Sequence, residues 1–185
     1  MLTIRIDDAF LYAHKLHRDQ TRKGKPIAYI SHLMTVSAIV IENGGTEDQA
    51  IGALLNDAAE DQGGHETLEE IRRLFGDAVA AIVYDCTDAW VEPKPEWRQR
   101  KEAYLANLPG KPPSSLLVLL ADKVHNAEAI LFDYRKLREH LWGRFTGGAD
   151  GTRWYYGALV DVFAVAMSDC RLTDRLRRAV TAWSV

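Results

Sequence analysis

Cysteine is scarce in this chain, with only Cys86 and Cys170 among 185 residues and no CxxC spacing. This scarcity excludes a disulfide framework and a zinc site built from cysteine pairs. Long apolar runs are also missing: the longest, Leu116 to Ala121, falls far below the roughly 20 residues that span a bilayer. The charged N-terminal stretch is unlike a signal peptide. We therefore expect a cytoplasmic protein without a membrane partner.

An excess of positive charge is missing as well. The chain has 23 basic and 26 acidic residues, a formal net charge of −3 and a pI near 6.1. A non-specific nucleic-acid binder is usually basic, so this class is disfavoured. A local basic pocket for phosphates stays compatible with the net charge, which says nothing about distribution. We expect a small-molecule partner and no nucleic acid, while the oligomeric state is not readable from the sequence.

Strand-like alternation is not sustained anywhere, whereas apolar residues recur at helical spacing along nearly the whole chain. The sequence therefore predicts an all-α fold, a single domain over residues 1–185 with roughly eight to ten helices. Breaks are expected at glycine and proline clusters. The main expected breaks are a loop over Asp19 to Ala28, glycine pairs at 44–45 and 63–64, a linker over Val91 to Pro95, a break over Pro109 to Pro113, and a glycine-rich loop over Gly143 to Gly151.

A capping box at Thr46 to Gln49 predicts the start of one helix that carries Ile51 through Glu60. On such a helix Asp57, Glu60 and Asp61 lie at i, i+3 and i+4, hence on one face. Three carboxylates on one face repel one another unless a cation or a basic partner lies among them. Alone, the cluster is more readily explained as a solvated face near a helix end.

Three other places carry polar groups that call for an explanation. His32 follows Tyr29 at a helix start, and Asp122 interrupts a strongly apolar stretch, where a lone carboxylate should be paired or metal-bound. A basic loop runs from Arg22 to Lys25. Taken singly, each has an ordinary interpretation: a satisfied histidine, a structural ion pair with Lys123, and a solvated turn.

The order and spacing of these places resemble the HD superfamily, and within it the Rel/Spo-type hydrolases of the alarmone (p)ppGpp and their small single-domain relatives. The resemblance runs from about residue 5 to 165. The segments that carry it are Arg22-Lys23-Gly24, Ala28 to His32, Ala53 to Asp61, Phe75-Gly76-Asp77, Lys94 to Lys101, Leu120 to Asn126 and Trp154-Tyr155-Tyr156. It implies a stand-alone metal-dependent phosphohydrolase of the stringent response, which removes the 3′-diphosphate of (p)ppGpp and carries no synthetase domain.

The resemblance also assigns roles to individual residues. The metal site of the family, which holds one divalent ion, typically manganese, falls on His32, Asn56, Asp57 and Asp122. Glu60 and Asp61 match the acidic pair that positions the attacking water and handles its proton. The matches to substrate-binding positions are Arg22, which stacks on the guanine base, Lys23, Lys123 and Asn126 at phosphates or ribose, and Tyr155 in the nucleotide pocket.

One position departs from the family pattern, because Asn56 stands where relatives have the histidine of the His-Asp pair. The change keeps the formal charge but replaces a nitrogen donor by a hard amide oxygen, which suits Mg²⁺, Mn²⁺ or Ca²⁺ better than late transition metals. Three outcomes are open: weaker manganese binding with turnover, preference for a harder ion, or loss of activity. His125, one turn from Asp122, is an alternative ligand.

Three functions follow from this sequence. The leading one is hydrolysis of (p)ppGpp to GDP or GTP and pyrophosphate. The second is a phosphohydrolase that acts on another nucleotide, which the base-stacking role of Arg22 disfavours. The third is a pseudo-hydrolase that binds the alarmone without cleaving it, and Asn56 is its support.

Overall fold

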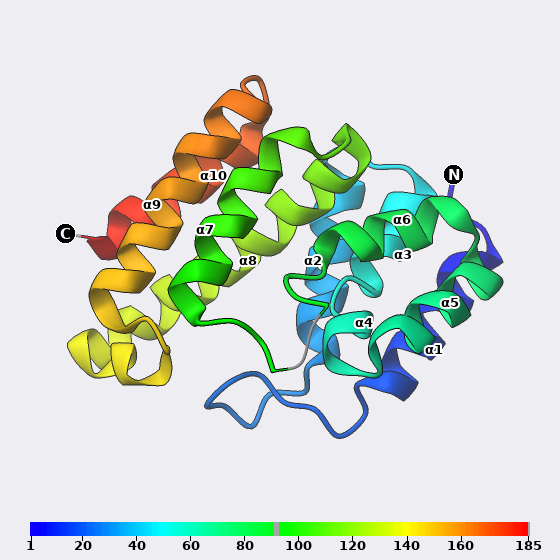
Figure 1. Ribbon diagram of the computed structural model, residues 1–185, viewed down its shortest axis with the longest axis horizontal. Coiled ribbons are helices and arrows are strands. Elements are labelled where there is room, and N and C mark those ends of the chain that lie inside the picture. The colour runs from blue at the N-terminus through cyan, green and yellow to red at the C-terminus, as the bar shows by residue number, and fades with distance from the viewer. Residues whose placement is uncertain (91–92, 185) are drawn as a thin grey trace. The chain divides into compact units, whose positions relative to one another are not determined.

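The computed structural model describes residues 1–90 and 93–184, and this part of the chain is helical. Ten α-helices and two 3₁₀ helices are described there, which confirms the predicted all-α fold (Figure 1). Outside helices, one isolated antiparallel bridge joins Thr21 to Ala28. The backbone divides into two compact units, residues 1–94 with 112–121 and residues 95–111 with 122–185. The expected single domain over 1–185 stays a prediction.

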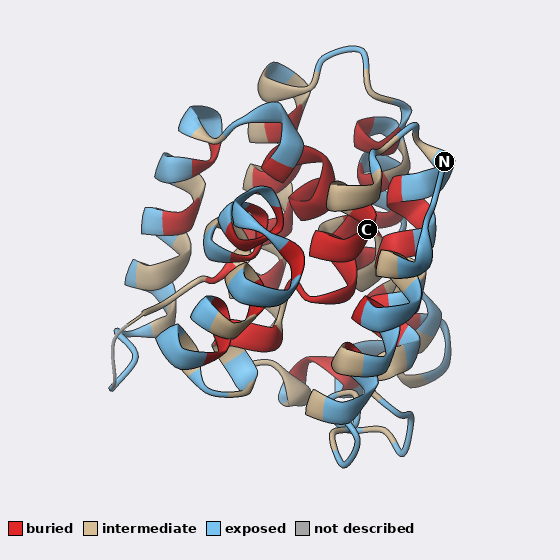
Figure 2. Cartoon of the chain, turned by 90° about the vertical axis from the view of Figure 1, so that its right-hand side faces the viewer, coloured by how far each residue is buried: buried red, intermediate tan, exposed pale blue. Residues whose placement is uncertain are grey.

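The first unit contains six complete helices and the beginning of a seventh. They are α1 (Ile4–Leu16), α2 (Ile30–Glu42), α3 (Glu47–Leu54), α4 (Ala58–Asp61), α5 (Gly64–Phe75), α6 (Asp77–Cys86) and the first residues of α8 (Pro113–Leu137). Helix α3 packs against α1, α2 and α6, and α5 packs against α4 and α6. Buried aliphatic residues such as Leu33, Ile51, Leu55 and Ile71 fill the space between them, and Figure 2 shows buried and exposed positions alternating along the helices.

Helix boundaries in this unit follow the capping signals in the sequence. Thr46 accepts a hydrogen bond from the Gln49 backbone, and the Gln49 side chain bonds the Thr46 N–H, which confirms the predicted capping box. Gly44 and Gly76 lie at helix ends with φ of 79° and 91°, a left-handed conformation that glycine adopts without strain. These signals determine where α3 begins and where α2 and α5 end.

The prediction of one helix through Glu60 is wrong. Helix α3 ends at Leu54, and a short turn at Leu55 to Asp57 precedes α4. Asp57, with φ −99° and ψ 0°, forms the N-cap of α4. The three carboxylates therefore do not share one face of a continuous helix.

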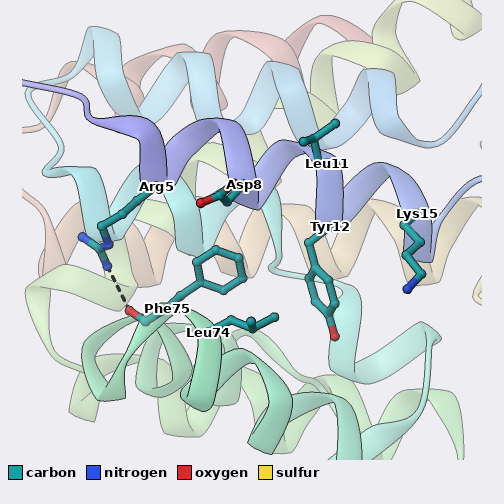
Figure 3. A pocket seen from close by; sticks show the side chains of 7 residues that line it. All are labelled: Arg5, Asp8, Leu11, Tyr12, Lys15, Leu74 and Phe75. Carbon is teal, nitrogen blue, oxygen red and sulfur yellow. Dashed lines mark hydrogen bonds between the residues drawn. The ribbon is translucent and has the colours of Figure 1, made fainter.

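Helix α1 and the end of α5 enclose a cavity of about 370 Å³ (Figure 3). Arg5 crosses one end of it, where its guanidinium donates to the Phe75 carbonyl at 2.9 Å and to Asp48 at 2.7 Å. Tyr12 and Leu74 contribute apolar surface. None of the residues with a predicted role in chemistry lines this cavity.

The second unit is built by three helices, two 3₁₀ turns and the remainder of α8. These elements are α7 (Trp97–Asn107), η1 (Leu108–Gly110), η2 (Arg138–Arg144), α9 (Gly148–Ala166) and α10 (Arg171–Ser184). Helix α9 packs against α7 and α10, and the fully buried Trp183 donates its indole N–H to the Ala127 carbonyl of α8.

Two expectations around this unit need comment. The glycine-rich loop predicted over 143–151 is wrong in its second half, because α9 begins at Gly148. A Cβ atom at Gly147 would lie 2.6 Å from the Trp97 ring, so glycine here permits close packing rather than a loop. In the linker expected over Val91 to Pro95, residues 91 and 92 lie outside the described residues. No helix in the described part is long and apolar enough to cross a membrane.

Candidate metal centre and acidic pair

The turn between α3 and α4 brings Asp57 to His32. Tyr29, directly before α2, donates its hydroxyl to Asp57 Oδ2 at 2.7 Å. His32 Nε2 lies 3.5 Å from the same oxygen, and the histidine is only 1% exposed. The rings of Tyr29 and His32 meet edge to face, 5.5 Å apart. A tyrosine that orients a carboxylate is the kind of outer contact that metal ligands usually have.

Asn56 is a buried polar residue at the same turn. The side chain is 2% exposed, and within residues 1–90 and 93–184 its Oδ1 atom has no hydrogen-bond partner. A buried unsatisfied acceptor costs about 1–3 kcal/mol and calls for a functional explanation. A bound cation would satisfy it.

The first unit thus supplies an imidazole nitrogen from His32, an amide oxygen from Asn56 and a carboxylate from Asp57. This donor set fits a divalent ion such as Mn²⁺. Across the described residues no group of three or more His, Cys, Asp or Glu side chains is gathered as a ligand set.

Asp122, the fourth predicted ligand, belongs to the second unit and lies on α8. Its carboxylate is 6% exposed and accepts hydrogen bonds from Lys123 Nζ and Asn126 Nδ2, both at 2.7 Å. Burial lowers the pKa of Lys123, but the charge and hydrogen bond of Asp122 together with the influence of Tyr104 and Tyr155 outweigh this, so the pKa lies well above its usual value. Lys123 is therefore a permanent cation beside Asp122.

Glu60 and Asp61 have clearly different surroundings. Glu60 accepts from Lys94 Nζ and from the Asp88 backbone N–H, each at 3.0 Å. Asp61 accepts from Gln20 Nε2 at 2.7 Å. Both residues line a cavity of about 240 Å³, whose wall includes Lys94, Gly63, Gly64, His65 and Trp90.

Burial and neighbouring charges shift the pKa of Asp61. Partial removal from water raises the pKa of Asp61 above its ordinary value, the hydrogen bond from Gln20 opposes this, and the negative charges of Asp57 and Glu60 raise it further. Glu60 is held instead by a cation and a backbone donor. The raised pKa makes Asp61 the candidate proton acceptor of the pair.

Of the predicted substrate-binding residues, Arg22 and Lys23 lie in the loop before α2. The loop is closed by a hydrogen bond from the Arg22 N–H to the Ile27 carbonyl at 2.8 Å. The Arg22 guanidinium lies 5.5 Å from the centre of the Tyr29 ring, while Lys23 is exposed. Arg22 and the Asp57 ligand position are thus linked through one tyrosine.

Tyr155, the remaining predicted contact, is buried in the second unit. Its ring lies 6.3 Å from that of Tyr104 and 5.1 Å from Lys101 Nζ. Lys123 Nζ lies 5.1 Å from the Tyr104 ring. The structure therefore brings Tyr155 and Lys123 to the same tyrosine, in a cluster of aromatic rings and cations.

Sequence reasoning missed three residues that organise the first unit's site. They are Tyr29 on Asp57, Gln20 on Asp61, and Lys94 on Glu60. Tyr29 could have been found from its position three residues before His32. Gln20 and Lys94 reach the acidic pair across 41 and 34 residues of sequence, and no local pattern signals such contacts.

A family model for the HD domain matches residues 9–140 of the chain. Among curated proteins, the guanosine-3′,5′-bis(diphosphate) 3′-pyrophosphohydrolase MESH1 of Xenopus tropicalis is 37% identical over 122 residues, 64% of this chain and 65% of that protein. Its human counterpart is 37% identical over 120 residues, 62% of this chain and 63% of that protein. The chain thus spans just under two thirds of the length of these relatives.

A longer relative, the GTP pyrophosphokinase of Streptomyces coelicolor, is 32% identical over 139 residues, 72% of this chain and 16% of that protein. Among solved structures, one described as a metazoan ortholog of SpoT that hydrolyzes ppGpp has a TM-score of 0.78 at 23% identity, covering 98% of this chain and 96% of that one. A structure from Listeria monocytogenes has a TM-score of 0.70 at 23% identity, covering 83% of this chain and 98% of that one. These likenesses show a shared fold.

Proposed function

Since the chain belongs to the HD domain family, whose hydrolases depend on a metal ion, we propose that it hydrolyses the 3′-diphosphate of ppGpp or pppGpp. Water adds to the phosphorus attached to the 3′ oxygen, that phosphorus–oxygen bond breaks, and the products are GDP or GTP and pyrophosphate. The observation that supports this most is the unsatisfied Asn56 oxygen beside the His32–Asp57 pair, on the turn that leads into Glu60 and Asp61.

We propose that His32, Asn56 and Asp57 hold one divalent ion, with Asp122 as the fourth ligand. Manganese is the ion that we expect, and the amide oxygen of Asn56 makes magnesium an acceptable alternative. When bound, the ion lowers the pKa of a coordinated water and polarises a phosphoryl oxygen. Tyr29 fixes the orientation of the Asp57 carboxylate through its hydrogen bond.

The two carboxylates of the acidic pair have different roles, which follow from their contacts. Asp61, with its raised pKa, accepts the proton of the attacking water. Glu60, held between Lys94 and the Asp88 N–H, orients the water. The proton is then delivered to the 3′ oxygen as it leaves.

The substrate-binding residues act by charge and by stacking. Arg22 stacks on the guanine base, and the exposed Lys23 meets a phosphate. In the second unit Lys123 supplies a permanent positive charge, Asn126 an amide, and Tyr155 an aromatic wall.

Pyrophosphate release from ppGpp by the purified protein tests this proposal. With Mn²⁺ the wild type should release pyrophosphate, Asp57→Ala should release none, and Asn56→His should be at least as active as the wild type. Arg22→Ala, assayed on a panel of nucleotides, should raise KM for ppGpp. Absence of cleavage in both the wild type and Asn56→His would contradict the proposal. Equal activity on nucleotides without guanine would point to another phosphohydrolase.

A second candidate, a sensor that binds the alarmone without cleaving it, is favoured by Asn56 alone. Isothermal calorimetry separates the two functions. A sensor binds ppGpp tightly and leaves it intact with every divalent ion, whereas the hydrolase consumes it when Mn²⁺ is added.

A further inference from the structure

Asp61 is held by a chain of side chains that begins at a buried histidine. His17, at the end of α1, is 2% exposed and places Nδ1 2.7 Å from Gln20 Oε1. The Gln20 amide nitrogen donates to Asp61 Oδ2 at 2.7 Å. Gln62 donates to Gln20 Oε1 at 2.8 Å, from the residue after Asp61. Four side chains from two distant segments thus form one network.

Because the Asp61 carboxylate is the acceptor at one end, the direction of each hydrogen bond from Gln20 back to His17 is determined. An ionised carboxylate only accepts hydrogen bonds, so Gln20 must turn its amide N–H toward Asp61 and its oxygen toward His17. That oxygen also only accepts, so His17 must carry a proton on Nδ1. In a neutral ring Nε2 is then unprotonated, and this atom is buried without a hydrogen-bond partner among the described residues.

The ring of His17 is fixed from the other side as well. It stacks on the Tyr29 ring, 5.2 Å away and inclined by 23°. Tyr29 in turn bonds Asp57. One packed pair of rings therefore supports both the Asp57 carboxylate and, through Gln20, the Asp61 carboxylate.

We propose that His17 and Gln20 are positioning residues, which hold the Asp61 carboxylate through Oδ2 so that Oδ1 is presented to the attacking water. This inference rests on the proposed function, because Asp61 needs orientation only if the chain hydrolyses its ligand. A preorganised proton acceptor requires less rearrangement in the transition state than one that rotates freely. The expected signature is a loss of kcat with little change in KM.

Variants at His17 distinguish the Nδ1–H donor from the rest of the ring. The amide nitrogen of asparagine lies two bonds beyond Cβ, as Nδ1 does in histidine, whereas that of glutamine lies three bonds beyond Cβ, as Nε2 does. Both variants lose the ring that packs on Tyr29, but His17→Asn should retain more of kcat than His17→Gln does. A purely structural role, in which the ring only packs on Tyr29, predicts equal effects of both.

Gln20→Met is the matched variant at the middle of the chain, because it keeps the length of the side chain and removes the amide. We expect kcat for pyrophosphate release to fall about 10–100-fold, the usual effect of losing an outer contact, with KM and Mn²⁺ affinity unchanged. Gln62→Met, which removes only the second donor to Gln20, should have a smaller effect. Wild-type kcat in Gln20→Met would overturn the inference.

Nitrogen-15 NMR of the histidine rings adds a readout that does not depend on activity. The wild type should show His17 protonated on Nδ1, and Gln20→Met should lose this preference. A wild-type spectrum with the proton on Nε2 would overturn the inference even in an active protein. If instead the wild type cleaves no 3′-diphosphate while His17 has the expected tautomer, the network is present but the proposed function fails.

Discussion

Asn56→Leu should be more stable than the wild type in the absence of metal and less stable than the wild type in the presence of Mn²⁺. In metal-free buffer, the wild type carries a buried acceptor without a partner. Such a group costs about 1–3 kcal/mol, and leucine, which has the same branched shape without polar atoms, removes this cost. Imperfect packing of the leucine side chain lowers the free energy of unfolding by up to about 1.5 kcal/mol. The net expectation is a gain of about 1 kcal/mol in the free energy of unfolding for Asn56→Leu.

Added Mn²⁺ should act in the opposite direction. A ligand at 100 times its Kd stabilises the folded state by about 2.7 kcal/mol. Only the wild type retains the amide oxygen, so its stability should rise and overtake that of the variant. For a chain of this size, 1 kcal/mol corresponds to about 2–4 °C in Tm. Asn56→Leu should therefore melt about 2–4 °C above the wild type in chelator and below it in saturating Mn²⁺.

Thermal unfolding followed by circular dichroism, with chelator and with Mn²⁺, measures both rankings. Asn56→His serves as the control, because it keeps a metal donor at the position and should be stabilised by the ion. If Asn56→Leu is destabilised in chelator and gains as much from Mn²⁺ as the wild type does, the reasoning is refuted, because the oxygen would then be neither costly nor a ligand.

Three more outcomes follow from individual contacts. Tyr29→Phe removes the hydrogen bond to Asp57 and should weaken Mn²⁺ binding about 10–100-fold by calorimetry, without loss of helical content; unchanged affinity would contradict the role given to the hydroxyl. Thr46→Ala breaks the capping box with Gln49 and should lower the free energy of unfolding by about 1 kcal/mol in urea titrations, whereas activity stays at the wild-type level. Asp61→Asn should abolish turnover and raise stability at neutral pH. The raised pKa of Asp61 means that its ionised form destabilises the folded state, a cost present above the folded pKa and absent once pH falls below the unfolded value. The gain should therefore vanish in acid, and a gain that persists at low pH would show another cause.

The sequence was sufficient for features encoded locally. The capping box at Thr46 and the glycine at position 44 are short-range signals, and both lie where the pattern predicted. The break at Asn56 was not predictable in this way. Its flanks are alanine and leucine, strong helix formers, and tertiary contacts of Asp57 with other helices override that preference.

The candidate site was likewise predictable from the sequence only in part. Resemblance to a family selected His32 and Asp57, and the structure places them 3.5 Å apart. The joint position of Asp122 with these two stays a prediction. The network from His17 to Asp61 was invisible in the sequence, because Gln20 and Asp61 are 41 residues apart and their contact depends on the tertiary fold. Hydrogen bonds across such separations carry no periodic signal.

The interruption between α3 and α4 also bears on how such a site can change over generations. Its backbone is fastened on both sides, by the Ala58 N–H to the Leu55 carbonyl and the Asp61 N–H to the Asp57 carbonyl. Neither bond uses the side chain of position 56. If the proposed ion binds here, an exchange of histidine for asparagine at position 56 changes the donor atom offered to it, while the backbone hydrogen bonds of the turn are not affected.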